Sequence, residues 1–215
     1  MSVIVPTLFD FQLSDTVFPI NTLSKKQAED LFRFFQHHPL FNWQQIHNGC
    51  EGRADAVCLL LESWNIPTAK AWVFGGAYLK GHIGGLKNNW NYHVAAVVPV
   101  TANGQPIYYV LDPATGDAMQ QIDEWAASVT DLAHSYHCIR QAHWYIFPDK
   151  NISTKKWNTR NKQNRKWMIQ CIAGINSLTA TGKAKLIFNK ILLKKTAAAF
   201  DKAKKENPHL FNCDK

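Results

Sequence analysis

The sequence lacks several features that would place the protein in a specialised class. It has no run of about 18 consecutive apolar residues, so we expect no membrane-spanning helix. No basic residue precedes Lys25 and no uninterrupted apolar segment follows Met1, so we expect no cleavable secretory signal, and either a cytoplasmic location or export by another route. It has neither internal repeats nor low-complexity stretches, and 12% aromatic residues are too many for a disordered chain. These absences leave a globular protein.

The sequence contains few cysteines, and their number is odd: five in 215 residues. A chain of this length can bury a core large enough to fold without disulfide bonds. The count therefore favours free thiols, or one special cysteine, over a disulfide framework.

Charge is divided unevenly along the chain. Residues 1–150 carry 9 Lys and Arg against 13 Asp and Glu, a net charge of −4, whereas residues 151–215 carry 15 against 3, a net charge of +12. We therefore expect a slightly acidic body over 1–150 and a basic extension over 151–215. The extension is where contact with an anionic surface is expected.

Two helices are predicted in the first third of the body. Ser24 is typical of an N-cap, and the apolar residues that follow predict a helix that ends before Pro39. A second helix is expected from Cys50 to about Asn65, with Asn48 as its N-cap and Glu51 reaching back as in a capping box. Its buried face is expected to carry the residues spaced three and four apart, namely Cys50, Ala54, Val57, Cys58 and Leu61.

Strand patterns follow at 69–74, 92–100 and 106–112. Asn103-Gly104 lies between the last two, and this dipeptide predicts a two-residue hairpin turn. Further along, we expect a glycine-rich loop over 75–85, a helix over 119–129, a strand over 144–147, and helices over 162–178 and 183–205 in the basic extension.

Cys50 stands out because it is expected in the first turn of a helix. The helix dipole and the unpaired N–H groups of that turn stabilise a thiolate, which lowers the pKa of a cysteine placed there. The other interpretation is a small buried side chain, and it is the better account of Cys58.

The predicted hairpin brings a histidine and an aspartate close together. If Asn103 and Gly104 form the turn, Asp112 lies opposite Ala95 and diagonal to His93 on the same face of the sheet. Diagonal neighbours lie about 7–8 Å apart at the backbone, within reach of a hydrogen bond between side chains. A cysteine at a helix start, then a histidine and an aspartate on neighbouring strands, is the order of papain-like and transglutaminase-like nucleophilic sites.

Three local motifs make the pattern more specific. They are Asn48-Gly49-Cys50-Glu51-Gly52-Arg53-Ala54, Trp90-Asn91-Tyr92-His93-Val94-Ala95 and Val110-Leu111-Asp112-Pro113. Together they resemble the bacterial protein-glutaminase family, whose motifs read approximately G-C-x-x-R-A, W-x-Y-H-V-A and I-D-P. The resemblance covers about residues 45–125 and implies an α+β fold, with a transglutaminase/papain-like core in which an antiparallel sheet packs on the nucleophile helix.

The resemblance also implies a cysteine amidohydrolase that converts glutamine side chains of proteins or peptides to glutamate and releases ammonia. Cys50 matches the nucleophile, His93 the general base and acid, and Asp112 the carboxylate that orients the histidine. Gln44 is a candidate oxyanion donor and Trp90 a candidate wall of the acyl slot. We expect neither a metal nor another cofactor.

Other functions remain compatible with the same residues. A transglutaminase or a cysteine peptidase would use the same triad, and a binding module with an inactive triad would use the basic extension on nucleic acid or a membrane. For the enzyme, the expected partners are a protein with an accessible glutamine, an inhibitory or immunity protein, and an anionic surface contacted by residues 151–215. No specific nucleic acid is expected.

Overall fold

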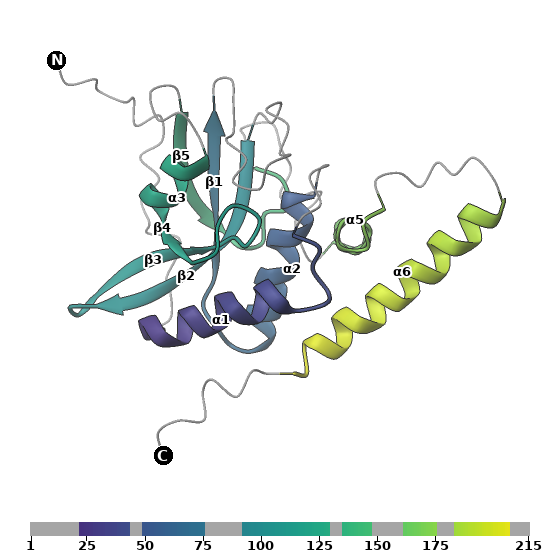
Figure 1. The fold of residues 1–215 in the computed structure, drawn as a ribbon, viewed down its shortest axis with the longest axis horizontal. Helices are drawn as coiled ribbons and strands as arrows, with labels where there is room; N and C mark the ends of the chain where they lie inside the picture. Colours follow the sequence, from purple (N-terminus) through teal and green to yellow (C-terminus); the bar gives the residue numbers. More distant parts are fainter. Residues whose placement is uncertain are drawn as a thin grey trace.

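The computed structural model describes residues 22–43, 49–75, 92–129, 135–147, 161–175 and 183–206. It shows an α+β fold in which helices cover both faces of one antiparallel sheet (Figure 1). The α+β class expected from the sequence is confirmed. No helix in these segments is both long and apolar enough to cross a membrane.

Five strands form the sheet in the order β4-β3-β2-β1-β5, and each hydrogen-bonded pair is antiparallel. The predicted hairpin is confirmed, because Ala102 pairs with Gln105 around Asn103 (φ 53°) and Gly104 (φ 77°). Two consecutive residues with positive φ are the requirement of a type I′ turn, which Asn-Gly satisfies. The bounds are β1 Ala69–Gly75, β2 Tyr92–Ala102, β3 Gln105–Leu111, β4 Gln120–Gln121 and β5 Ser135–Gln141.

The larger core lies on the face of the sheet that α1 (Lys25–His37) and α2 (Cys50–Ser63) cover. Ser24 caps α1 and exchanges hydrogen bonds with Gln27 as a capping box. The five residues predicted for the buried face of α2 are all buried. α5 (Lys162–Ile172) packs on α2, and α6 (Lys183–Ala203) packs on α5, so α5 lies between these two helices (Figure 1).

The opposite face of the sheet is covered by the short helix α3 (Ile122–Val129). Its inward residues form a second core with the strands, which consists of Ala71, Val73, Ala95, Val97, Val110, Trp125, Ala126 and Val129. The sheet is therefore buried on both faces, which explains why β2 is a continuous apolar run instead of an alternating one.

A buried ion pair ties α2 to the sheet. The Nζ of Lys70 in β1 donates to Asp55 Oδ1 at 2.7 Å and to the carbonyl oxygen of Trp144 at 2.6 Å, and the side chains of Lys70 and Asp55 are both fully buried. Burial raises the pKa of the Asp55 carboxyl to about 6, although Lys70 opposes this shift.

Several expectations were wrong in detail. The N-cap of α2 is Gly49 (φ 127°), which makes no side-chain cap hydrogen bond, and Asn48, the expected N-cap, lies outside the described residues. The last strand lies at Ser135–Gln141 and not at 144–147, because its partner β1 pairs with residues 135–141.

Two helices also have different limits from those predicted. Residues 120–121 pair with β3, so the helix expected from Met119 begins at Ile122. α5 ends at Ile172, and Gly174 (φ 71°) follows it, with Ile175 N–H donating to the carbonyl of Gln170. This is the hydrogen-bond pattern of a Schellman motif, which stops a helix.

Candidate active site

The three residues predicted for the site come from three elements. Cys50 is the first residue of α2, His93 is the second residue of β2, and Asp112 directly follows β3. The last pair of the β2–β3 ladder is Ala96 with Leu111, so the next positions, Ala95 and Asp112, stand opposite each other as expected. The expected hydrogen bond is present, because His93 Nε2 lies 2.7 Å from Asp112 Oδ2.

Asp112 is held by three further donors. Thr115 Oγ1 donates to Asp112 Oδ2 at 2.7 Å, Trp125 Nε1 donates to the same oxygen at 3.0 Å, and the Ala114 N–H donates to Oδ1 at 3.3 Å. The Trp125 N–H also reaches Thr115 Oγ1 at 3.2 Å. The side chain of Asp112 is therefore fixed in both position and orientation.

These donors decide the charge of Asp112. Burial raises the pKa of its carboxyl, but His93, Thr115 and Trp125 together lower that pKa below its ordinary value of 3.8. The carboxylate is thus ionised near neutral pH, and it stabilises a positive charge on His93 when the imidazole takes up a proton.

Sequence reasoning missed Thr115 and Trp125. Thr115 stands three residues after Asp112, a spacing typical of side-chain hydrogen bonds in turns, and this signal was available. Trp125 lies on α3, ten residues further on, and its ring is 5.8 Å from that of His93. No local pattern points to Trp125, because only the packing of α3 on the sheet brings it to the carboxylate.

The thiol of Cys50 differs from the expectation. It is buried and donates to Glu51 Oε2 at 3.4 Å, while Glu51 Oε1 accepts from the Tyr92 hydroxyl. Burial and the Glu51 carboxylate raise the pKa of Cys50 well above its ordinary value, and Arg53 opposes the shift. The expected lowering by the helix start is therefore outweighed, and these surroundings favour the protonated thiol.

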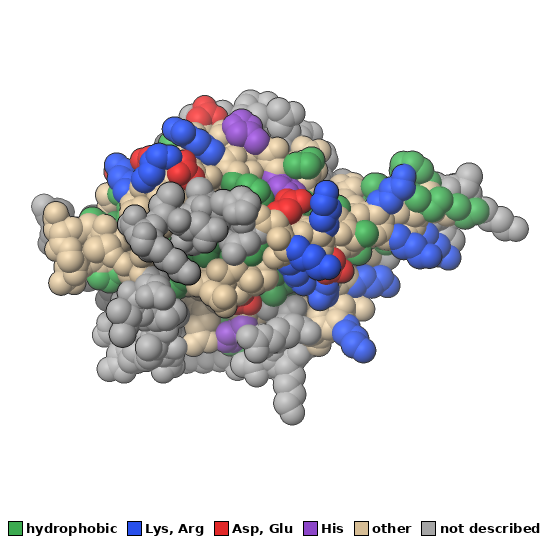
Figure 2. Space-filling model, turned by 90° about the horizontal axis from the view of Figure 1, so that it is seen from below, with side chains coloured by type: hydrophobic (Ala, Val, Ile, Leu, Met, Phe, Trp, Pro, Cys, Tyr) green, Lys and Arg blue, Asp and Glu red, His purple; other side chains and the backbone are tan. Residues whose placement is uncertain are grey.

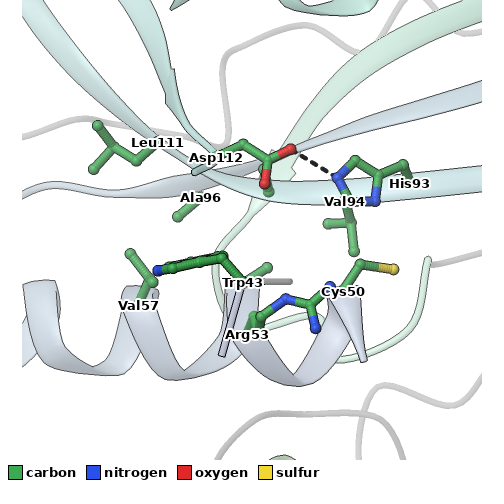
Figure 3. A pocket seen from close by; sticks show the side chains of 11 residues that line it. Trp43, Cys50, Arg53, Val57, His93, Val94, Ala96, Leu111 and Asp112 are labelled. Atoms are coloured by element: carbon green, nitrogen blue, oxygen red, sulfur yellow. Dashed lines mark hydrogen bonds and ion pairs between the residues drawn. The ribbon is translucent and has the colours of Figure 1, made fainter. Parts of the chain in front are cut away.

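Cys50 and His93 lie on opposite faces of the sheet and line the same cavity. Cys50 packs on Val94 on the α2 face, whereas His93 faces Trp125 on the α3 face. Both residues line one small cavity together with Asp112, at the point where the chain leaves the β2–β3 ladder after Leu111. In Figure 3 one ring nitrogen of His93 points to Asp112 and the other is directed to the side of Cys50.

The cavity is nearly filled by the protein itself. It has room for about one water molecule, and Arg53 and Trp43 also line it. The Arg53 guanidinium lies 5.9 Å from the centre of the Trp43 ring, and its side chain is buried. Arg53 therefore packs beside Cys50.

Helix α5 supports the start of α2 from behind. A Cβ atom placed on Gly52 would lie 2.3 Å from Cys171 Cβ, and one placed on Gly49 would lie 3.5 Å from the same atom. Only glycine at position 52 allows α5 to approach this closely. The basic extension therefore contributes, through Cys171, to the packing of the turn that carries Cys50.

Two candidate residues lie outside the described residues, namely Gln44 and Trp90, and so does the glycine-rich loop after Gly75. The four cysteines within those residues, Cys50, Cys58, Cys138 and Cys171, are free. In the same part of the chain, no group of three or more His, Cys, Asp or Glu is arranged to hold a metal.

A family model and solved structures match this chain. Residues 28–129 match the model of a family described as glutaminase. The NMR structure of protein-glutaminase from Chryseobacterium proteolyticum superposes with a TM-score of 0.57 at 18% identity, over 74% of this chain and 88% of that one. A crystal structure of protein-glutaminase gives a TM-score of 0.55 at 15% identity over the same shares.

At these identities the structural matches establish the fold. None of the curated proteins matches the chain significantly. The matched family segment includes Cys50, His93 and Asp112.

Proposed function

Residues 28–129 belong to the glutaminase family, and from this premise we propose that the protein deamidates glutamine side chains of proteins or peptides through Cys50, His93 and Asp112. The observation that carries the proposal is the shared cavity of these three residues within the matched segment. His93, which is held by its hydrogen bond to Asp112, serves as the base, and Cys50 serves as the nucleophile.

The reaction proceeds in two displacements. His93 takes the proton of the Cys50 thiol, and the sulfur attacks the carboxamide carbon of the glutamine. His93 returns that proton to nitrogen as the C–N bond breaks, so ammonia leaves and a thioester remains. Water, deprotonated by His93, then attacks the thioester carbon, and the C–S bond breaks to release glutamate and the Cys50 thiol.

Asp112 and the helix start stabilise the charges that develop. The ionised Asp112 stabilises the imidazolium at each step and keeps the ring nitrogen on its side protonated. The Cys50 backbone N–H, in the first turn of α2, is one donor to the oxyanion, and Gln44 is proposed as a second.

The raised pKa of Cys50 fits a site that is activated by substrate. The thiol keeps its proton while it donates to Glu51. A carboxamide placed beside the sulfur displaces this contact and exposes the thiol to His93, so proton transfer coincides with attack. We propose residues 1–150 as the catalytic unit and residues 151–215 as an extension that packs on it through α5.

The test measures ammonia release from a glutamine-rich protein such as casein. We expect release by the unaltered chain, a loss of at least roughly a thousandfold in Cys50→Ala and His93→Ala, and a smaller loss in Asp112→Asn. Cys58→Ala is the matched control, because Cys58 is a second buried cysteine on the same face of α2. It should retain activity.

The products distinguish the alternatives. Deamidation leaves the backbone of casein intact and converts glutamine to glutamate in its mass spectrum. Cleaved peptides would indicate a peptidase, and incorporation of a fluorescent amine would indicate a transglutaminase. If ammonia release does not depend on Cys50, the proposal is wrong.

A further inference from the structure

Helix α6 has one face packed on the body and one face in solvent. Its inner residues recur three and four apart and either belong to the main core or pack against it, namely Leu193, Ala197, Phe200 and Ala203. They lie from the middle of the helix to its C-terminal end. In Figure 1 this part lies against the body, and the first half extends away from it.

The first half of α6 carries the large apolar side chains that are exposed among the described residues. Ile187 is 58% exposed, Phe188 64% and Ile191 49%. Ile187 and Ile191 are four apart and therefore share a face, which is not the inner one because Leu193 and Ala197 define that side. Figure 2 shows hydrophobic side chains gathered at the projecting end of the helix. We call these three residues the apolar tip.

Lysines surround the apolar tip. Lys190, Lys194 and Lys195 are all exposed and lie within two turns of Ile191. Among the described residues, no acidic side chain lies within ion-pair distance of these three lysines, whereas Lys202 and Lys204 at the other end of the helix reach Glu206 and Asp201. The described residues around the apolar tip are thus both apolar and positively charged, with no acidic side chain among residues 187–199.

We infer that the outer face of α6 binds the surface of an anionic lipid bilayer. The apolar tip would enter the boundary between headgroups and acyl chains, where Phe and Ile gain from leaving water. Lys190, Lys194 and Lys195 would lie at the level of the lipid phosphates. Each lysine near such a surface strengthens binding by roughly fivefold.

The exposed side chains of α6 favour an anionic bilayer over two other partners, a second copy of the chain and nucleic acid. A second copy of the chain would bring lysines against lysines around the apolar tip, which opposes association. Nucleic acid would match the lysines but would leave Ile187, Phe188 and Ile191 in water, because its phosphate backbone offers them no apolar surface. A bilayer with anionic headgroups satisfies both kinds of side chain.

The test uses the full chain and sedimentation with vesicles. We expect binding to vesicles of equal parts phosphatidylcholine and phosphatidylglycerol, and none to vesicles of phosphatidylcholine alone. Replacing the apolar tip by Ile187→Ser, Phe188→Ser and Ile191→Ser should reduce affinity by at least roughly a hundredfold. Lys194→Gln with Lys195→Gln should reduce it by roughly twentyfold.

A matched control separates local from overall charge. Lys25→Gln with Lys162→Gln removes two exposed lysines outside α6 and should leave affinity within about twofold. Each substituted side chain lies on the surface, so the urea midpoint of each variant should stay at that of the unaltered chain.

Four results would overturn the inference. They are absence of binding to the mixed vesicles, equal binding to both kinds of vesicle, equal losses in the two lysine pairs, and unchanged affinity without the apolar tip. Concentration-dependent dimerisation that the serine variant abolishes would assign the apolar tip to a second copy. Tight binding to duplex DNA that needs the lysines but not the apolar tip would assign the lysines to nucleic acid. The measurement needs no catalysis, so it stands apart from the proposed deamidation.

Discussion

The two sides of the candidate site are built in opposite ways. On the histidine side, four donors converge on Asp112 and keep its carboxyl ionised in spite of burial. On the cysteine side, burial and the carboxylate of Glu51 keep the thiol protonated. The sign of each pKa shift follows from the groups that face the buried atom: donors favour a charge, whereas apolar surroundings and a like charge disfavour it.

The difference teaches where activation must occur. Under the proposed mechanism, His93 and Asp112 already have the arrangement that catalysis needs, so substrate is expected to change little there. Under the same mechanism, Cys50 must lose its proton and its contact with Glu51 before it attacks the substrate. The following four experiments test this contrast, beginning with the largest expected effect.

Gly52→Ala should disrupt the cysteine side most. The added Cβ would meet Cys171 Cβ at 2.3 Å, so α5 must move away from the turn that carries Cys50. We expect the free energy of unfolding to fall by about 3 kcal/mol, measured by urea denaturation, since overpacking in a core has this magnitude. Ammonia release should fall with it.

Two variants check this cause. Gly116→Ala places a Cβ no closer than 3.7 Å to any atom and should change stability little. Cys171→Gly removes the atom that clashes, so it should restore part of the loss when combined with Gly52→Ala. A Gly52→Ala chain as stable as the original would show that α5 does not support this turn.

Trp125→Phe should weaken the hydrogen bonding that holds Asp112 beside His93. It removes the indole N–H that donates to Asp112 Oδ2 at 3.0 Å. A hydrogen bond to a charged group contributes about 2 kcal/mol, so the free energy of unfolding should fall by about that amount. Trp64→Phe is the control, because the indole of Trp64 donates at 3.1 Å to the neutral carbonyl of Lys204 and its loss should cost about 1 kcal/mol. Equal losses in both variants would contradict the special role of Asp112.

Glu51→Gln should lower the pKa of Cys50 and so favour its ionised form, as the donors around Asp112 favour the ionised carboxylate. Glutamine keeps an acceptor for Tyr92 but lacks the charge that raises the pKa of Cys50. The thiolate fraction at neutral pH should increase, and alkylation of Cys50 by iodoacetamide should be roughly tenfold faster for each unit by which the pKa falls. Glu62→Gln changes an exposed glutamate on the same helix and should leave the rate unchanged. If alkylation is not faster in Glu51→Gln, the carboxylate of Glu51 does not raise the pKa of Cys50.

The smallest expected effect is the pH dependence of stability. Asp112 has a pKa below its ordinary value of 3.8 in the folded chain, so its contribution is complete above about pH 4. The contribution is lost as the pH falls through the folded pKa. In urea titrations below pH 4, the unaltered chain should lose stability more steeply than Asp112→Asn, by at most about 1.4 kcal/mol per pH unit. Asp117→Asn, at an exposed position, should follow the unaltered chain. Parallel curves for Asp112→Asn and the unaltered chain would contradict the lowered pKa.

Much of the site could be read from local patterns. The Asn103-Gly104 turn sets the register of β2 and β3, and the register alone brings Asp112 to His93. The apolar spacing of α2 correctly predicted that Cys50 opens a buried face. These features depend on neighbours in the sequence, so short-range rules suffice for them.

Other features could not be read in this way. Glu51 was expected to cap α2, but it accepts hydrogen bonds from Tyr92 and Cys50. The strand expected at 144–147 lies at 135–141 because its limits are set by pairing with β1. In both cases a contact between distant segments replaced the local alternative.

The sequence by itself determined the first two helices, the hairpin and the pairing of His93 with Asp112, because the turn geometry and the period of two along a strand leave one register. Only the tertiary structure decided the charge states of the site. Burial, the approach of Trp125 from α3 and the packing of α5 behind Gly52 depend on segments far apart in the chain, and a pKa responds to every group that surrounds the atom in space.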